Sequence, residues 1–232
     1  MKSIFFLSTI LSIVGLHNSI AQNPLSQSTQ VEINMGWVTP FLQSGSELTR
    51  AENIRSSGQS YFAGSEGNRR DVGSYPALSG ISFGIGFYKP VRWAKGLMLG
   101  AVVRNSQTGS QPEEGGYEEG YFFNFLTAGA AAKYYPFESN NLFLLADLGL
   151  GAVFTKNRFE NESNEQEFFH QFGIGSGSSI GMGYAFTPFN NKEKSLELKV
   201  IYQQLSTRVE VNGIGDDQWQ FGALHIGTSY NF

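Results

Sequence analysis

The sequence predicts an all-β protein, an eight-stranded antiparallel up-and-down transmembrane β-barrel. Three observations carry this prediction. Eight segments alternate apolar with small or polar residues, the connections between them are alternately short and long, and charged residues gather on the face that is not apolar. The composition agrees, because 41% of the 232 residues are apolar and only 16% are charged, whereas disordered chains are poorer in apolar residues and richer in charge.

The first 21 residues predict a secretory signal peptide. Lys2 supplies a positive start, residues 4–16 are apolar, and Ser19 and Ala21 are the small residues that precede a cleavage site. The apolar stretch is too short for a comfortable transmembrane helix. We therefore expect residues 1–21 to be removed and residues 22–232 to form the exported barrel domain, with an uncleaved N-terminal anchor as the alternative.

The strands are predicted from alternation with a period of two residues, which places successive side chains on opposite faces of a strand. Ile81, Phe83 and Ile85 alternate with Ser82 and Gly84, and the same pattern recurs along the chain. The expected strands, with boundaries good to a few residues, are 30–41, 78–88, 97–106, 121–135, 142–155, 169–186, 195–210 and 218–232.

The connections between these strands fall into two classes that alternate strictly. Three are short and contain proline, at 89–96, 136–141 and 187–194. Four are polar and mostly longer, at 43–77, 107–120, 156–168 and 211–217. Membrane barrels have short periplasmic turns and longer extracellular loops, so we expect the outer loops to carry the acidic residues Glu113, Glu114, Glu118, Glu119, Glu160, Glu162, Glu165 and Glu167.

The face of the strands that is not apolar is unusually hydrophilic. By the alternation of the strands, this face holds Glu32, Arg104, Asp147, Glu197, Lys199 and His225, and we expect Lys133 to lie on it as well. Arg208 joins too if a β-bulge lies near Gln203 and Gln204, where the alternation slips. A soluble core could bury so many charges only at a large cost, whereas a membrane barrel can pair them in its interior. A two-sheet sandwich with these charges in water remains the alternative.

Aromatic residues gather near the two ends of the expected strands, as they do where a barrel crosses two membrane interfaces. Near the short turns lie Tyr88, Trp93, Tyr134, Tyr135, Phe137, Tyr184, Phe186, Phe189 and Tyr230. Toward the long loops lie Trp37, Phe41, Tyr121, Phe154, Phe159, Phe168 and Trp219. We expect these residues to form two belts.

The last strand resembles the C-terminal targeting strand of bacterial outer-membrane barrels. Leu224, Ile226, Tyr230 and Phe232 share one face, and the final residue is aromatic. Together with the turn at 133–137, this makes residues 22–232 resemble the small outer-membrane barrel family, grouped as outer membrane protein beta-barrel domain or porin-family proteins and similar to OmpX and OmpA. The resemblance implies residence in a Gram-negative outer membrane, contact with its lipids and barrel-assembly machinery, and a structural, adhesive or assembly role.

Several functional classes are disfavoured by the sequence. The chain has no cysteine, which excludes a thiolate metal site and a cysteine nucleophile. A net charge of −4 argues against nucleic acid as a partner. His225 and Ser229 share a face, but four residues along a strand separate them by about 13 Å. We therefore expect no catalytic residue, metal or cofactor.

The function expected from the sequence is that of a monomeric, non-enzymatic outer-membrane protein. Its role would be structural, or would consist of binding a protein partner through the acidic extracellular loops. Three alternatives stay open: a narrow channel for small solutes, a component of a secretion or assembly complex, and a soluble lipocalin-like carrier.

Overall fold

A computed structural model describes residues 28–42, 79–110, 113–114, 117–137, 141–160, 166–187, 194–211 and 215–232. These residues form β1 (Gln30–Leu42), β2 (Ser79–Pro90), β3 (Leu97–Ser110), β4 (Glu113–Glu114), β5 (Tyr117–Tyr134), β6 (Leu142–Glu160), β7 (Gln166–Phe186), β8 (Ser195–Val211) and β9 (Gly215–Asn231). The eight predicted strands are thereby confirmed, and β4 is a two-residue addition that pairs with the start of β5. The predicted signal peptide and the loop at 43–77 lie outside the described residues.

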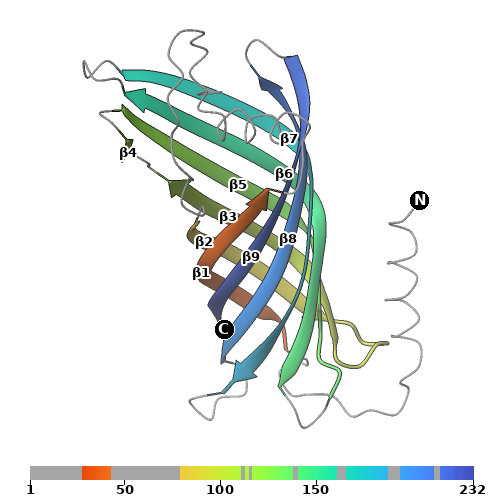
Figure 1. The fold of residues 1–232 in the computed structure, drawn as a ribbon. Helices are drawn as coiled ribbons and strands as arrows, with labels where there is room; N and C mark the ends of the chain where they lie inside the picture. The colour runs from red at the N-terminus through yellow and green to blue at the C-terminus, as the bar shows by residue number, and fades with distance from the viewer. Residues whose placement is uncertain are drawn as a thin grey trace.

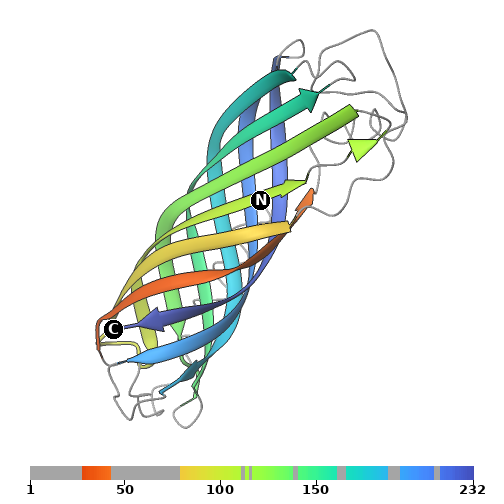
Figure 2. The same ribbon diagram turned by 90° about the vertical axis from the view of Figure 1, so that its left-hand side faces the viewer.

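The long strands close into a barrel. Each pairs antiparallel with its neighbour in the chain, and β1 also pairs with β9. Figures 1 and 2 show the strands running obliquely around a common axis. Val31 and Phe232 exchange two backbone hydrogen bonds of 3.1 Å, which seal the seam between the first strand and the end of the chain. The described part of the chain holds no helix with the length and hydropathy of a membrane span.

The two faces of the wall differ as the alternation predicts. The outward face is apolar on every long strand, with side chains such as Ile33, Ile85, Val103, Leu126, Leu150, Met182, Leu198 and Ile226 between 46% and 71% exposed. The inward face holds the charged residues and buries them. A soluble barrel would place its apolar face inside, so this arrangement is that of a barrel surrounded by lipid, and the alternative of a soluble carrier fails.

The strands extend further at the loop end than the sequence suggested. β3 continues to Ser110, β6 to Glu160, and β7 already starts at Gln166. Six of the eight acidic residues assigned to loops therefore lie in strands: Glu113, Glu114, Glu118, Glu119, Glu160 and Glu167. Outside the membrane both faces of a strand can be polar, so alternation no longer reveals where the strand ends. Glu162 and Glu165 lie outside the described residues.

The short connection between β2 and β3 is a compact turn. Val91 donates a backbone hydrogen bond of 2.9 Å to Leu97, and the backbone of Tyr135 donates one of the same length to Gly96. Gly96 has a φ of 76°, a conformation that side chains disfavour. A Cβ added there would also lie 2.3 Å from the carbonyl oxygen of Tyr135, so this turn requires glycine.

The expected aromatic belts are present only in part. Trp93, Phe137, Tyr184, Phe186 and Tyr230 are exposed at the end with the short turns, and Trp37 and Phe154 are exposed toward the loops. Tyr88, Tyr135 and Trp219 are instead buried inside the barrel, because they fall on the inward parity of their segments. Tyr134 is half-buried, and the side chains of Phe41, Tyr121, Phe159, Phe168 and Phe189 are outside the described part.

Candidate functional site in the barrel interior

Four charged side chains meet in the half of the interior nearest the short turns. Lys133 Nζ lies 2.9 Å from Glu32 and 2.9 Å from Glu197, and Lys199 Nζ lies 2.5 Å and 3.0 Å from the same two carboxylates. The side chains come from β1, β5 and β8, so they span the lumen. We call these four residues the charged ring, in which each lysine contacts both glutamates.

The charged ring is enclosed by further contacts. Ser229 Oγ donates a hydrogen bond of 3.0 Å to Glu197, and Tyr135 donates one of 3.4 Å. Lys133 Nζ also lies 4.6 Å from the ring centroid of Tyr88 and 5.0 Å from that of Phe143, within the range of cation–π attraction. All four charged side chains are at most 6% exposed, so their desolvation is offset by one another and by these neighbours.

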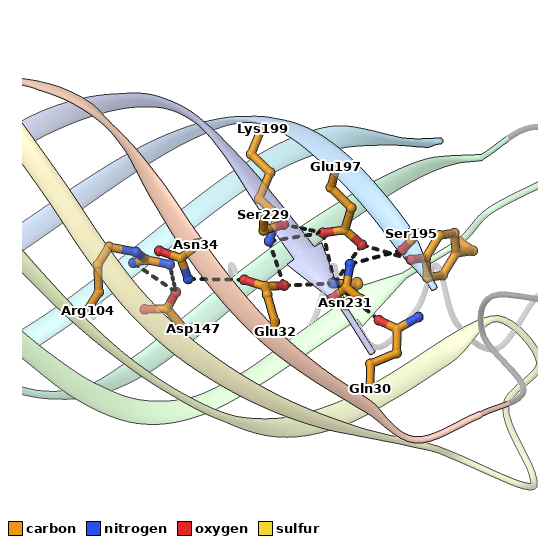
Figure 3. Close-up of polar contacts among 12 residues, drawn as sticks. Gln30, Glu32, Asn34, Arg104, Asp147, Ser195, Glu197, Lys199, Ser229 and Asn231 are labelled. Carbon is orange, nitrogen blue, oxygen red and sulfur yellow. Dashed lines mark hydrogen bonds and ion pairs between the residues drawn. The ribbon is translucent and has the colours of Figure 1, made fainter. Parts of the chain in front are cut away.

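A second ion pair lies further toward the loops. Arg104 of β3 is 3.4 Å from Asp147 of β6, and Ser179 of β7 donates a hydrogen bond to the same carboxylate. Asn34 donates to Glu32 at 3.1 Å. Figure 3 shows Arg104, Asp147 and Asn34 on one side of Glu32, and Glu197, Asn231 and Gln30 on the other. The polar contacts therefore form a column along the lumen.

His225 lies in a hydrogen-bonded chain with Gln203 and Thr127. Gln203 Nε2 donates to Thr127 Oγ1 at 3.0 Å, and its Oε1 lies 2.8 Å from His225 Nε2. That amide oxygen is an acceptor, so His225 donates through Nε2. Ser229 donates its hydrogen bond to Glu197 and not to His225. His225 and Ser229 share a face of β9 but have separate partners, so they form no nucleophile–base pair.

Four buried aromatic rings meet at the loop end of the lumen, where the alternation of the sequence does not reveal them. Phe125 and Phe221 have centroids 5.0 Å apart, Phe123 lies 6.1 Å from Phe221, and Trp219 lies 5.8 Å from Phe221. All four are at most 4% exposed. We call them the aromatic layer. β5 is apolar on both faces here, with Phe122 outward and Phe123 inward, so alternation gave no signal.

The structure places seven of the eight residues expected in the interior on the inward face. Of these, it brings Glu32, Lys133, Glu197 and Lys199 into the charged ring and pairs Arg104 with Asp147. The expectation for Arg208 is wrong. β7 and β8 pair without interruption from Phe186 with Leu196 to Gly173 with Val209, so no bulge shifts the parity and Arg208 faces outward. The targeting-strand residues Leu224, Ile226, Tyr230 and Phe232 also face outward.

Two layers of buried side chains thus cross the interior. An eight-stranded barrel has a lumen that side chains can just fill, and here the charged ring lies in the half nearest the short turns, the Arg104–Asp147 pair lies further toward the loops, and the aromatic layer lies at the loop end. In the part of the chain that the structure describes, no three His, Asp or Glu residues converge in a way that could hold a metal ion.

The chain is similar in fold to several solved outer-membrane proteins. Ail of Yersinia pestis is 14% identical over 89% of this chain and 100% of its own, with a TM-score of 0.48. OprG from Pseudomonas aeruginosa is 13% identical over 92% and 99%, with a TM-score of 0.41. Neisserial surface protein A is 15% identical over 88% and 97%, with a TM-score of 0.37. No protein-family model matches the sequence, and no curated protein matches it either.

The class of protein follows from the opposite polarity of the inner and outer faces of the barrel wall. A closed barrel with an apolar outer surface and paired charges inside satisfies its backbone hydrogen bonds internally and meets lipid on its outside. The chain is an integral outer-membrane β-barrel of the small, eight-stranded kind.

Proposed function

We propose that this protein is a non-enzymatic outer-membrane protein that acts through its extracellular end, by binding a basic partner or by supporting the envelope. The observation that carries the proposal is the lumen, which the charged ring occupies toward the short turns and the aromatic layer toward the loops. Buried side chains at both levels of the lumen disfavour transport through the centre, and they leave the strand extensions at the loop end as the surface that other molecules can bind.

The backbone register favours a basic partner. Glu113 pairs with Glu118, and Glu118 pairs with Glu160, so three acidic residues of β4, β5 and β6 are direct neighbours. Glu210 of β8 likewise pairs with Asp216 of β9. Like charges opposite one another destabilise a sheet. A cationic partner would relieve this repulsion, and it would be attracted over about 8 Å at physiological salt.

The test uses poly-L-lysine as the probe and the protein reconstituted in neutral vesicles. Replacing Glu118 and Glu160 by Gln should weaken binding several-fold at low salt and by less at high salt, since salt screens the attraction between charges in water. The matched control is Glu138→Gln with Glu193→Gln, in the short connections at 136–141 and 187–194, which also removes two negative charges. Equal binding by all three proteins, or a salt-independent difference, would contradict a role for the acidic strand extensions.

A further inference from the structure

The turn between β2 and β3 presents an unusually exposed aromatic side chain between two positive charges. Trp93 is 78% exposed, more than any other large hydrophobic residue in the described part of the chain. Arg92 and Lys95, which lie on either side of it in the sequence, are exposed as well. We call residues 91–96 the basic turn. Figure 1 shows it, in yellow, at the end of the barrel opposite the strand extensions.

The basic turn holds these side chains on a fixed backbone. Ala94 donates a backbone hydrogen bond of 3.2 Å to Val91, and Leu97 donates one of 3.1 Å to Ala94. Ala94 is buried and anchors the middle of the turn, and Gly96 closes it in the left-handed conformation. A surface that is already ordered loses little conformational entropy when it binds a partner. The basic turn is therefore suited to recognition.

The positive charge of the basic turn is not balanced locally. Residues 72–112 contain no acidic residue. Glu32 and Glu197, the acidic side chains that the structure describes in this half of the barrel, are buried and paired with the lysines of the charged ring. Arg92 and Lys95 are thus left to attract an anionic partner from outside the barrel.

Trp93 stands beyond the lipid-facing band of the wall. Phe87 is the last apolar outward residue of β2, and Lys89 follows it on the same face, with Nζ 5.5 Å from the centroid of the Phe87 ring. A lysine on the outer face costs little only near an interface, so Lys89 marks the edge of the band. Trp93 lies four residues further along the chain, and in barrels of this kind the short turns face the periplasm.

We propose that the basic turn binds a glycan strand that carries carboxylates, which is the chemistry of the peptidoglycan layer in the periplasm. An indole ring offers a large, rigid apolar face, against which the C–H face of a sugar ring packs. Arg92 and Lys95 pair with carboxylates of the peptides attached to the glycan. The position of Trp93 beyond Lys89 favours the glycan over a phospholipid headgroup. This inference does not rest on the binding proposed for the acidic strand extensions, which lie at the other end.

Co-sedimentation with purified peptidoglycan sacculi tests the proposal, with the full barrel in a neutral detergent and no lipid. The wild-type protein should sediment with the sacculi. Trp93→Ala should weaken this binding roughly two- to tenfold, as the loss of an aromatic contact implies. Arg92→Gln with Lys95→Gln should weaken it more at low salt than at high salt, because salt screens the attraction between charges.

Two matched controls change the same types of residue elsewhere. Trp37→Ala removes an exposed tryptophan from the outer wall. Lys156→Gln with Arg208→Gln removes two exposed positive charges toward the loops. Both controls should bind sacculi as the wild type does. The mobility of each variant in SDS before and after boiling shows whether its barrel has folded.

A second measurement separates the glycan from the membrane. In phosphatidylcholine nanodiscs, which expose both ends of the barrel, a Trp37→Phe protein retains Trp93 and the buried Trp219. Acrylamide in the water should quench the fluorescence of Trp93, and soluble peptidoglycan fragments should protect it. Brominated phosphatidylcholine should quench it little.

Four results would overturn the proposal. The first is the absence of binding to sacculi. The second is equal binding by the wild type and Trp93→Ala, which would show attraction between charges alone. The third is strong quenching of Trp93 by brominated lipid, which would place the ring in the membrane and assign the cations to phospholipid headgroups. The fourth is an equal loss of binding in the control variants, which would show that the site lies elsewhere.

Discussion

At the residue scale, the charged ring is stable only as a set. Lys133 and Lys199 each contact both Glu32 and Glu197, so removing one lysine leaves two carboxylates to share the other. Breaking a buried ion pair by removing one partner costs about 3–5 kcal/mol, whereas replacing a whole pair by neutral groups can be nearly neutral. The ring therefore predicts a non-additive response to substitution.

Lys133→Met should lower the free energy of unfolding by about 3–5 kcal/mol, because Met cannot neutralise the two carboxylates. Lys133→Met with Glu197→Gln should be less destabilised than the single variant, since one positive and one negative charge then remain. Urea unfolding of the barrel in detergent micelles measures both, with exposed Lys89→Met as the control. A double variant less stable than the single one would show that the ring is not a coupled unit.

Residues also show what the sequence could not determine. Glu32, Arg104, Asp147, Glu197, Lys199 and His225 were placed inside by parity alone, because a charge is expensive on a lipid-facing wall. Strand parity does not show which of these residues contact one another, since closure of the barrel brings together strands that are distant in the chain. Arg208 was misplaced because the slip at Gln203 and Gln204 reads as a bulge, although it only marks where the outward face becomes polar.

At the element scale, the turn between β2 and β3 depends on Gly96. A residue with a side chain in the left-handed conformation costs about 1–2 kcal/mol, and its Cβ would meet the carbonyl oxygen of Tyr135. Gly96→Ala should therefore destabilise the folded barrel by at least about 1–2 kcal/mol, measured by urea unfolding. Lys95→Ala, at the exposed neighbouring position, should have little effect. Equal stability of both variants would refute the requirement for glycine.

The aromatic layer is also a property of particular strands. Phe125→Ala should leave a cavity between β5 and β9 and cost about 3–5 kcal/mol. Phe122→Ala on the lipid-facing side of the same strand should cost less, because lipid can fill the space. The two unfolding midpoints in vesicles measure the difference. A larger loss for Phe122→Ala would mean that the rings inside do not support the barrel.

Strand positions were well predicted where one face meets lipid and poorly predicted beyond it. β2 and β8 alternate cleanly along their membrane-facing length, and their boundaries lie within a few residues of expectation. The sequence predicts loops where β3, β6 and β7 extend, because water on both sides removes the alternation on which the prediction rests. The alternation does not reveal the aromatic layer for the opposite reason, since both faces of β5 are apolar there.

At the scale of the whole molecule, the inverted distribution of polarity defines the protein. Leu150 lies near the middle of the apolar outward run of β6 and is 71% exposed. Leu150→Arg should destabilise the barrel in a bilayer by about 2–4 kcal/mol, whereas Gln204→Arg near the edge should cost about 0–1 kcal/mol. Unfolding in vesicles measures both. Equal costs would contradict the assignment of this surface to lipid.

The closed lumen is the central claim, and ion conductance across a planar bilayer tests it most directly. The wild-type protein should show no stable conductance steps, because the charged ring and the aromatic layer block the lumen at two levels. A variant that shortens both, with Lys133→Ala, Glu197→Ala, Phe125→Ala and Phe221→Ala, should open measurable steps if it folds. Steady conductance by the wild-type barrel would contradict the account and identify the protein as a channel.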